Sequence, residues 1–498
     1  MRFYWIIPAL VSGIVAVSGC APTAKPPVSR ALSPASVSPN IVLIVADDQG
    51  WADLGLSGMS ADVATPNLDR LAREGVRFTN AYATSPICNA SRAGLITGNY
   101  QQRQGIYWYG GPGIHDASIP TLPEYLHPKG YSNLYVGKFH YGTPRESDNS
   151  RRDFPLRHGF DHFFGFEGGR KHYLHHQQAL EETFLAQKKR YAKEGQSLAQ
   201  GPMWEDDVQK DQQGFSTQLF GAKAREFIEA QDGKPFFLQL SFNAVHNFTH
   251  QLPADYLKKH GLKGYHDWDP ATEEYQAWYE RSRYPNNPEG RAHYLAQLDY
   301  LDSEIGEVLD YLDSRGLRES TVVIYLSDNG GSTPIYANNG ILRGSKYTLY
   351  EGGIRIPMIV SWPQAFLQNA VSDEIVSALD LVPTVCALVG GCDNLKTDGK
   401  DIRALLSDEH AQVERAFLAW DTGHETALRK GRWKLKTAKP SSQKHAKNEM
   451  VEIELGEFLF DLEADPGEQR DLSKQFPEKM NELKADHNAW RQSIRQGL

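Results

Sequence analysis

The sequence predicts an α/β fold in which a large, doubly wound, mostly parallel sheet is flanked by helices. Three apolar segments carry this prediction: "NIVLIVA" (40–46), "PFFLQLSF" (235–242) and "STVVIYLS" (320–327). Each is rich in aliphatic, aromatic and β-branched residues without polar alternation, which is typical of strands buried on both faces. Helical patterns at 215–231 and 293–316 precede the last two, and alternation of helix and buried strand indicates a doubly wound sheet.

The chain begins with a segment typical of export signals. Arg2 precedes an apolar run at residues 3–17, and small residues lead to Cys20. The ending Val-Ser-Gly-Cys resembles a bacterial lipobox, which predicts a signal peptide at 1–19 and a lipid on the Cys20 thiol. An ordinary signal peptide with a chance cysteine is the alternative. We expect a lipid-anchored protein of the cell envelope, on the periplasmic or surface face of an outer membrane.

Residues 20–39 predict a tether, because five prolines in this short stretch cannot build a core. No later stretch approaches 18 consecutive apolar residues, so the lipid is the only membrane attachment that we expect. The folded body is predicted to start at residue 40 and to end at 408.

The first strand of this body leads into two acidic residues, Asp47 and Asp48. A helix is expected next, with Thr65 as its N-cap, Pro66 at its first position and Gly75 as its stop. The strand at 320–327 likewise leads into acidic and amide side chains.

A polar stretch, "TSPICNASRAGLITG", contains Cys88, one of only four cysteines in 498 residues. Asn89 is a favourable N-cap and predicts a helix running to Gly98, with Cys88 at the helix N-terminus, where backbone N–H groups attract anions. On this pattern alone a lone cysteine is more often structural than catalytic.

The last part, 409–498, predicts a smaller α+β subdomain with an antiparallel sheet. Short strands are expected within 425–438 and 457–472, followed by a terminal helix at 477–496. Before it, Cys386 and Cys392 bracket the end of a predicted helix, and the sequence leaves open whether they form a disulfide or remain two buried thiols.

The net charge of −9 argues against nucleic acid as a bulk partner. Polar residues at two strand ends indicate a different ligand. Asp47 and Asp48 end one buried strand, and Asp328 and Asn329 end another. Four oxygen-bearing side chains suit a hard divalent cation, most simply Ca²⁺. Capping of the following helices is the alternative.

With these patterns in view, the chain resembles the formylglycine-dependent (type I) sulfatases of the alkaline phosphatase superfamily. "CNASR" is similar to the family's C-x-[P or A]-x-R signature, with Ala90 at the position where proline is usual. "VGKFHYG" has Phe139 in place of the usual tryptophan, and "NAVH" has Val245 in place of proline. The resemblance covers the body from residue 40 in the same motif order, and also includes "NIVLIVADDQGWADLG", "LSDNGG" and "LRGSKYTLYEGGIRIPMIV".

The resemblance implies that a maturation enzyme, formylglycine-generating or anaerobic, oxidises Cys88 to formylglycine (3-oxoalanine). Its hydrate would attack sulfur, with Arg92 and Ca²⁺ favouring its ionised form. Lys138, His246 and Lys346 would surround the sulfate. His246 would protonate the leaving oxygen and His140 would take the proton whose loss expels sulfate. The implied calcium ligands are Asp47, Asp48, Asp328 and Asn329.

The expected activity is hydrolysis of sulfate esters on polysaccharides or oligosaccharides, such as algal ulvan, carrageenan or fucan, or animal glycosaminoglycans. Two rivals remain: a phosphonate or phosphate ester hydrolase of the same superfamily, and a non-catalytic glycan-binding lipoprotein.

Three further segments are candidates for substrate contact. "GFEGGRKHYLHH" is one, with His172 as its candidate ligand and Arg170, His175 and His176 beside it; a second metal site and a solvated loop are the alternatives. The aromatic residues Tyr265, Trp268, Tyr275, Trp278 and Tyr279 suit sugar rings but equally pack an insertion onto the body. The basic run at 428–447 either meets an anionic chain or forms a solvated hairpin.

Overall fold

The central strands of the main sheet are parallel, as the sequence predicts. The computed structural model describes residues 38–143, 148–169, 173–175, 203–210, 212–264 and 272–496. β1 (Asn40–Ala46) lies between β9 (Phe236–Ser241) and β10 (Thr321–Ser327), and β3 (Ser132–Phe139) and β4 (His162–Glu167) extend the parallel part beyond β9. Every residue of β1, β9 and β10 is buried, which explains their unbroken apolar sequences.

Antiparallel pairs lie on both sides of the parallel part of this sheet. β11 pairs antiparallel with β10 and with β2, whereas β6 and β7 continue antiparallel from β4. Two short strands, β12 and β13, pair parallel with β2. The bounds are β2 (Gly75–Tyr82), β6 (Met203–Glu205), β7 (Val208–Lys210), β11 (Arg355–Ser361), β12 (Ala370–Ser372) and β13 (Val376–Ser377).

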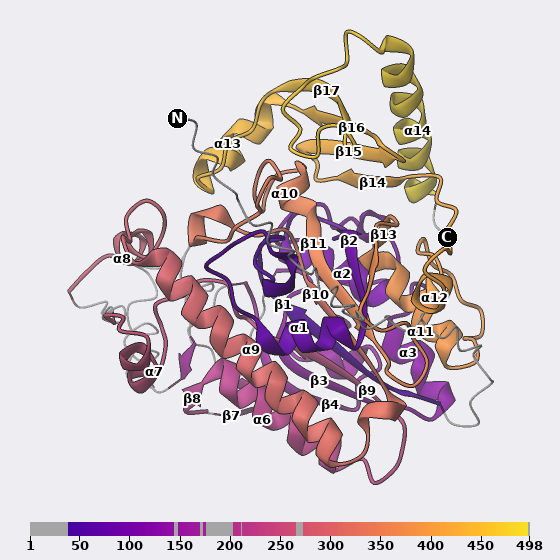
Figure 1. Ribbon diagram of the computed structural model, residues 1–498. Helices are drawn as coiled ribbons and strands as arrows, with labels where there is room; N and C mark the ends of the chain where they lie inside the picture. The colour runs from indigo at the N-terminus through magenta and orange to yellow at the C-terminus, as the bar shows by residue number, and fades with distance from the viewer. Residues whose placement is uncertain are drawn as a thin grey trace, which may run out of the picture.

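Helices cover both faces of the sheet and form two apolar cores (Figure 1). α1 (Pro66–Arg73), α6 (Ser216–Glu229) and α9 (Gly290–Ser314) pack on one face. α2 (Cys88–Thr97) and α11 (Leu381–Leu388) pack on the other. This two-faced arrangement is the predicted doubly wound architecture.

The helix predicted after Thr65 begins at Pro66 as expected, but the Thr65 side chain does not cap it. The Thr65 hydroxyl donates to the Asp69 carboxylate at 3.0 Å and accepts from the Gly55 N–H at 2.8 Å. The helix ends at Arg73, and Gly75 is already the first residue of β2.

The C-terminal part is an antiparallel four-stranded sheet that lies against the main body (yellow and gold in Figure 1). Its strands are β14 (Leu418–Asp421), β15 (Glu425–Lys430), β16 (Trp433–Ala438) and β17 (Gly456–Asp461). α14 (Pro477–Arg495) packs its apolar side on this sheet, so the predicted α+β subdomain is present.

Shorter elements connect these parts. They are α3 (Leu122–Leu126), β5 (Leu174–His175), β8 (Gly214–Phe215), α7 (Ala254–Lys259), α8 (Tyr275–Arg281), α10 (Glu351–Ile354), α12 (Arg403–Ser407) and α13 (Pro440–Asn448).

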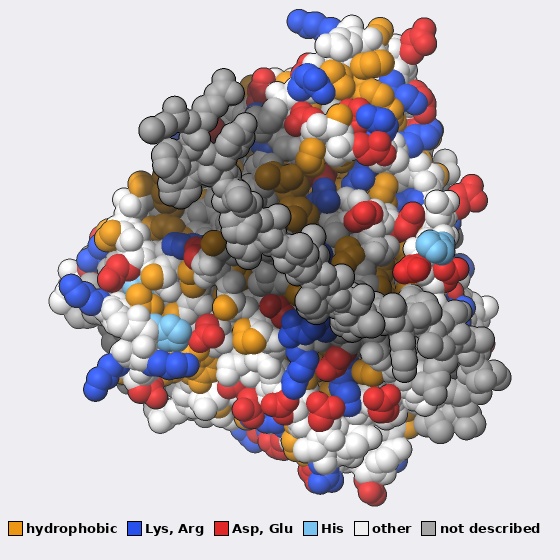
Figure 2. All heavy atoms as spheres, viewed as in Figure 1, with side chains coloured by type: hydrophobic (Ala, Val, Ile, Leu, Met, Phe, Trp, Pro, Cys, Tyr) orange, Lys and Arg blue, Asp and Glu red, His pale blue; other side chains and the backbone are white. Residues whose placement is uncertain are grey.

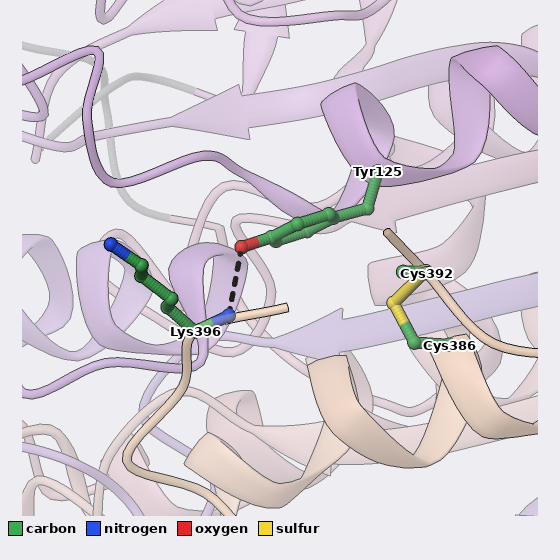
Figure 3. The surroundings of a disulfide bond; sticks show 4 residues. All are labelled: Tyr125, Cys386, Cys392 and Lys396. Carbon is green, nitrogen blue, oxygen red and sulfur yellow. Dashed lines mark hydrogen bonds between the residues drawn. A yellow bond between two sulfur atoms is a disulfide. The ribbon is translucent and has the colours of Figure 1, made fainter. Parts of the chain in front are cut away.

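A disulfide joins Cys386 to Cys392, which decides the question that the sequence left open (Figure 3). Cys386 lies in α11 and Cys392 in the loop that follows it. Farther along this loop, the Lys396 N–H donates to the Tyr125 hydroxyl of α3 at 3.3 Å. The bond and this contact hold the loop against the body.

Charges of both signs are interspersed over the face of the molecule in Figure 2. Within the described residues, no helix is both long enough and apolar enough to cross a membrane. The predicted signal peptide, Cys20 and the tether up to residue 37 lie outside the described residues.

Candidate active site

The acidic residues that follow β1 and β10 lie side by side. The two strands are parallel neighbours with Ala46 opposite Ser327, so the residues after each strand emerge at the same edge. The Asp48 N–H donates to the Asp328 carboxylate at 3.3 Å, and the Asn329 amide donates to Asp48 Oδ1 at 2.8 Å. All four predicted metal ligands, including Asp47, are at most 1% exposed.

This group has the features of a site for a hard cation. Asn329 Oδ1 is buried and has no hydrogen-bond partner among the described residues, which leaves an oxygen ligand available. Ligand atoms of Asp47, Asp48, Cys88 and His246 lie within 4.8 Å of one another. This cluster shares two aspartates with the predicted set and adds the candidate nucleophile and a histidine. Carboxylate and amide oxygens are the donors that Ca²⁺ prefers.

Cys88 is the first residue of α2 and contacts the acidic group. Its Sγ lies 3.4 Å from Asp47 Oδ1 and 3.8 Å from Asp48 Oδ1, and the residue is 3% exposed. Burial, together with Asp328 and Asp47, raises the pKa of the Cys88 thiol well above its usual value. The unmodified side chain therefore stays a neutral thiol in this environment.

The prediction that Asn89 caps this helix is wrong. The N-cap position is Ile87, and Asn89 is the second helical residue. The Asn89 amide instead donates to the carbonyl oxygens of Trp108 and Gly110, both at 3.1 Å. These carbonyl oxygens belong to a loop outside the helix, so the residues around Asn89 alone could not predict the hydrogen bonds.

Three cations surround the acidic residues, and all are at most 2% exposed. Arg92, in α2, donates from Nε to Asp328 at 2.8 Å and from Nη1 to the Lys138 carbonyl at 2.9 Å. Lys138 Nζ pairs with Asp47. Lys346 Nζ lies 2.7 Å from Asp48 Oδ2 and 3.1 Å from Cys88 Sγ. Lys138 is fully buried although it lies near the end of β3, so it is not a surface residue.

The pKa values of Asp47 and Asp328, which lie among these cations, shift in opposite directions. Burial opposes ionisation of Asp47, but Lys138, His246 and Arg92 outweigh it and hold the pKa of Asp47 well below its usual range. Burial and the negative Asp47 raise the pKa of Asp328 to about 6. The site thus has one firmly ionised carboxylate beside one that is held less firmly.

Two histidines complete the group. His140 follows β3 and is 8% exposed, and burial with Lys138 and Arg92 holds its pKa well below 6.5. His246 follows β9, and its Nε2 lies 3.5 Å from Asp48 Oδ2. Burial and Lys346 lower the pKa of His246 to about 4. A neutral His140 is suited to accept a proton.

Four aromatic and imidazole rings, two of them from the C-terminal subdomain, contact one another near this group, and no sequence motif predicted them. The Trp108 ring contacts Tyr347, His424 and His445, with centroids 6.3, 5.3 and 5.3 Å away. The rings of His424 and His445 are 3.9 Å apart. We call these four residues the ring wall; all are partly exposed. They come from three distant segments, so no local spacing could reveal them.

The ring wall adjoins the nucleophile at two points. The Trp108 carbonyl accepts the hydrogen bond from Asn89, the residue after Cys88. Tyr347 follows Lys346, whose Nζ lies 5.3 Å from the centre of the Tyr347 ring.

The predicted substrate segments have different outcomes. Arg170, His172, His176, Tyr265 and Trp268 lie outside the described residues, and His175 is in β5. Trp278 and Tyr279 are 3% and 5% exposed and pack against Phe248, as expected for an insertion held on the body.

The basic run is not a solvated hairpin throughout. Lys434 and Lys436 are fully buried and pair with glutamates inside the protein.

Comparison with known proteins agrees with this geometry. Residues 39–391, most of the chain, match the model of the sulfatase family. The chain belongs to the sulfatase family. It is therefore a sulfuric ester hydrolase. Residues 344–493 match a second model, the C-terminal region of N-sulphoglucosamine sulphohydrolase.

Individual relatives cover most of this sulfatase. It is 30% identical to arylsulfatase J of Mus musculus over 88% of this chain and 73% of that protein. It is 28% identical to the N-acetylgalactosamine-6-O-sulfatase of Bacteroides thetaiotaomicron over 95% of this chain and 96% of that protein. The crystal structure of Ps i-CgsB in complex with k-i-k-neocarrahexaose is 25% identical, with a TM-score of 0.73 over 91% of this chain and 93% of that one.

Proposed function

We propose that this sulfatase hydrolyses sulfate esters of carbohydrates, using a formylglycine derived from Cys88 and a bound Ca²⁺. The observation that carries the proposal is the position of Cys88. Its side chain lies against Asp47 and Asp48 on one side and 3.1 Å from Lys346 Nζ on the other. A nucleophile at this point has a cation site and a sulfate-binding cation within reach.

Formylglycine would replace the inert thiol by an aldehyde, whose hydrate offers one hydroxyl to attack sulfur and a second whose deprotonation expels sulfate. Calcium, when bound, supplies positive charge that stabilises negative oxygens. The oxygen-rich group of Asp47, Asp48, Asp328 and Asn329 fits such an ion, and Asn329 Oδ1 has no other partner among the described residues.

The side chains around Cys88 can divide the remaining work. Lys138 and Lys346 are buried cations that suit the anionic sulfate. The pKa of His246 is about 4 in the free site, and a bound sulfate anion would raise it, so that a protonated His246 would donate a proton to the departing alcohol oxygen. His140, whose pKa is well below 6.5, would accept a proton during release of sulfate. Arg92 would hold the acidic group in place through Asp328.

The ring wall supports a carbohydrate rather than a small inorganic ester as the substrate. Trp108 and Tyr347 contact Asn89 and Lys346, the neighbours of the nucleophile, and aromatic rings are suited to pack against the apolar faces of sugar rings. Partly exposed histidines at 424 and 445 offer hydrogen bonds to hydroxyl groups. We include galactans such as carrageenan, ulvan, fucan and glycosaminoglycans in this class. We also include His172, which lies outside the described residues, as a substrate contact.

Mass spectrometry of the peptide that contains Cys88, from protein made in the native host, tests maturation. We expect an aldehyde in place of the thiol. The Cys88→Ala variant should keep its thermal unfolding temperature but lose hydrolysis of 4-nitrophenyl sulfate. If Cys88→Ala has nearly the activity of the wild-type enzyme, the proposal is contradicted.

Trp108→Ala tests the substrate class. It should raise KM for sulfated oligosaccharides from carrageenan or chondroitin, while hydrolysis of 4-nitrophenyl sulfate changes little. An equal loss on both substrates would show that Trp108 supports the site rather than the sugar. Faster turnover of an aryl phosphonate than of the aryl sulfate would favour the phosphonate hydrolase instead.

Export and anchoring through Cys20 to an outer membrane remain part of this proposal, supported by the lipobox-like sequence. Labelling of the native host with a fatty-acid analogue would detect the lipid, and Cys20→Ser should abolish the label. A labelled Cys20→Ser protein would refute the anchor.

A further inference from the structure

Charged residues are buried where the C-terminal sheet meets the main body. Lys434 and Lys436 alternate with Leu435 along β16, so both lysines lie on one face and Leu435 on the other. Leu435 packs into the core beneath α14, whereas both lysines are fully buried toward the main body. Burial of ionic groups needs partners, and each lysine has a carboxylate within 3 Å.

Two of these carboxylates also bind the backbone of the segment that carries Lys346. Glu425 Oε2 accepts from the Leu349 N–H at 2.8 Å, and Glu468 Oε2 accepts from the Glu351 N–H at 2.6 Å. The other oxygens of the same two carboxylates face the lysines: Lys436 Nζ is 2.6 Å from Glu425 Oε1 and Lys434 Nζ is 2.8 Å from Glu468 Oε1. Each glutamate therefore links the C-terminal sheet to the segment at 346–351.

The side of the segment near Lys346 has anchors of its own, including the hydrogen bonds that join Ser345 to Thr348. The Lys346 N–H donates to the Gly331 carbonyl at 3.1 Å, and the Tyr347 N–H donates to the Pro86 carbonyl at 2.9 Å. Tyr347 has a φ of 75°, a backbone conformation that is unfavourable for a residue with a side chain and must be held by its surroundings. The bonds to the two glutamates begin three residues after Lys346 and fix the far side of this turn.

Stability alone gives a weak reason for such an arrangement. Replacing a buried ion pair by apolar residues of similar volume is often neutral or stabilising. A carboxylate held by a lysine differs from an apolar contact because it accepts a backbone N–H from one direction only. The arrangement thus specifies where the segment lies. This position matters most at Lys346, because its Nζ contacts Cys88 and Asp48.

We propose that Glu425 and Glu468 are positioning residues that hold the segment at 346–351, and so place Lys346 Nζ at the sulfate site. The C-terminal subdomain then completes the active site although neither glutamate touches the substrate. The inference rests on the proposed function, in which Lys346 binds sulfate.

A double-mutant cycle with Lys346 tests this role. Glu425→Ala and Glu468→Ala are each made in the mature full-length protein and in a Lys346→Ala background. With Lys346 present, we expect kcat/KM for 4-nitrophenyl sulfate to fall about 10- to 100-fold, the loss typical of a small misplacement of a catalytic group. In the Lys346→Ala background, the same substitutions should change kcat/KM less than about twofold, because the lysine that the glutamates position is absent.

Calorimetric titration with inorganic sulfate gives the same cycle without turnover. Glu425→Ala should weaken sulfate binding only when Lys346 is present. Glu425→Gln keeps an oxygen that can accept the Leu349 N–H and should restore most of the lost activity. Asp461→Asn is the matched control: Asp461 is a 7% exposed carboxylate of the same sheet, 2.8 Å from Arg432 Nε, and should leave activity unchanged.

Thermal unfolding of every variant shows whether it folds. Equal losses with and without Lys346, or full activity of folded Glu425→Ala and Glu468→Ala, would overturn the positioning role. Full activity of Lys346→Ala alone is a different result, because it would remove Lys346 from the proposed function before the glutamates are considered.

Discussion

Arg92 offers a test of how the buried acidic group is held together. Its side chain is fully buried, and so is its partner Asp328, whose carboxylate is 2.8 Å from Arg92 Nε. Replacement by alanine removes the cation and leaves a buried carboxylate next to Asp47. Breaking a buried ion pair from one side typically costs about 3–5 kcal/mol, because the remaining charge has no compensation.

Calcium changes this expectation in a defined way. If Asp328 is a calcium ligand, the bound ion compensates its charge, so Arg92→Ala should lower the free energy of unfolding less in calcium than in EDTA. Arg92→Lys keeps the charge but cannot reach Asp328 and the Lys138 carbonyl together. Loss of one such bond to a charged group costs about 1.5–3 kcal/mol, so this variant should be intermediate.

The assay is urea unfolding at pH 8, with calcium and with EDTA. High pH is chosen because the pKa of Asp328 is already raised to about 6, and protonation at lower pH would hide part of the loss. Losses for Arg92→Ala that are equal in calcium and in EDTA would refute the assignment of Asp328 to the metal site. A loss below about 1 kcal/mol in EDTA would refute the estimate from burial.

Three further experiments address other parts of the molecule. His246→Ala should slow hydrolysis of a sugar sulfate about 10²–10⁴-fold but that of 4-nitrophenyl sulfate far less, because a phenolate leaves without a proton, whereas His140→Ala should slow both; equal losses for His246→Ala would remove its acid role. Asn329→Ala should weaken calcium binding, measured by calorimetry, by about tenfold or more, and unchanged affinity would exclude Asn329 as a ligand. Burial raises the pKa of Glu304 from 4.5 to about 7, so its folded state holds a proton more tightly and stability falls as pH rises between these values. Glu304→Gln should therefore remove up to about 3 kcal/mol of this fall, measured by unfolding at pH 4.5 and 8. An unchanged pH profile would show that burial does not raise the pKa of Glu304.

The sequence was informative wherever a function depends on short segments. The strands at 40–46 and 320–327 are continuous apolar runs, and the residues after them had to emerge at one edge if the strands were parallel neighbours. Asp47, Asp48, Asp328 and Asn329 do meet there. The lysines and histidines were found through motif resemblance, and their mutual distances needed the structure.

Local reasoning failed where a side chain has distant partners. Asn89 has the composition of an N-cap, but carbonyls of the loop at 108–110 bind its amide instead. Lys434 and Lys436 resemble a solvated basic hairpin in sequence, but the C-terminal sheet buries both of them against the main body. In each case a contact between segments far apart in the chain outweighs the local preference.

Sequence patterns were therefore enough to predict the main strands and helices, the subdomain at the C-terminus and the candidate reacting residues. These follow from hydrophobic patterns and short motifs, which act over a few residues. The folded chain was needed to find the Cys386–Cys392 bond, the ring wall and the two glutamates that bind the Lys346 segment. The ring wall and the two glutamates depend on how the C-terminal subdomain packs on the main body, and side chains that meet across such an interface have no fixed spacing in the sequence. The disulfide joins cysteines only six residues apart, but this spacing alone did not distinguish it from two buried thiols.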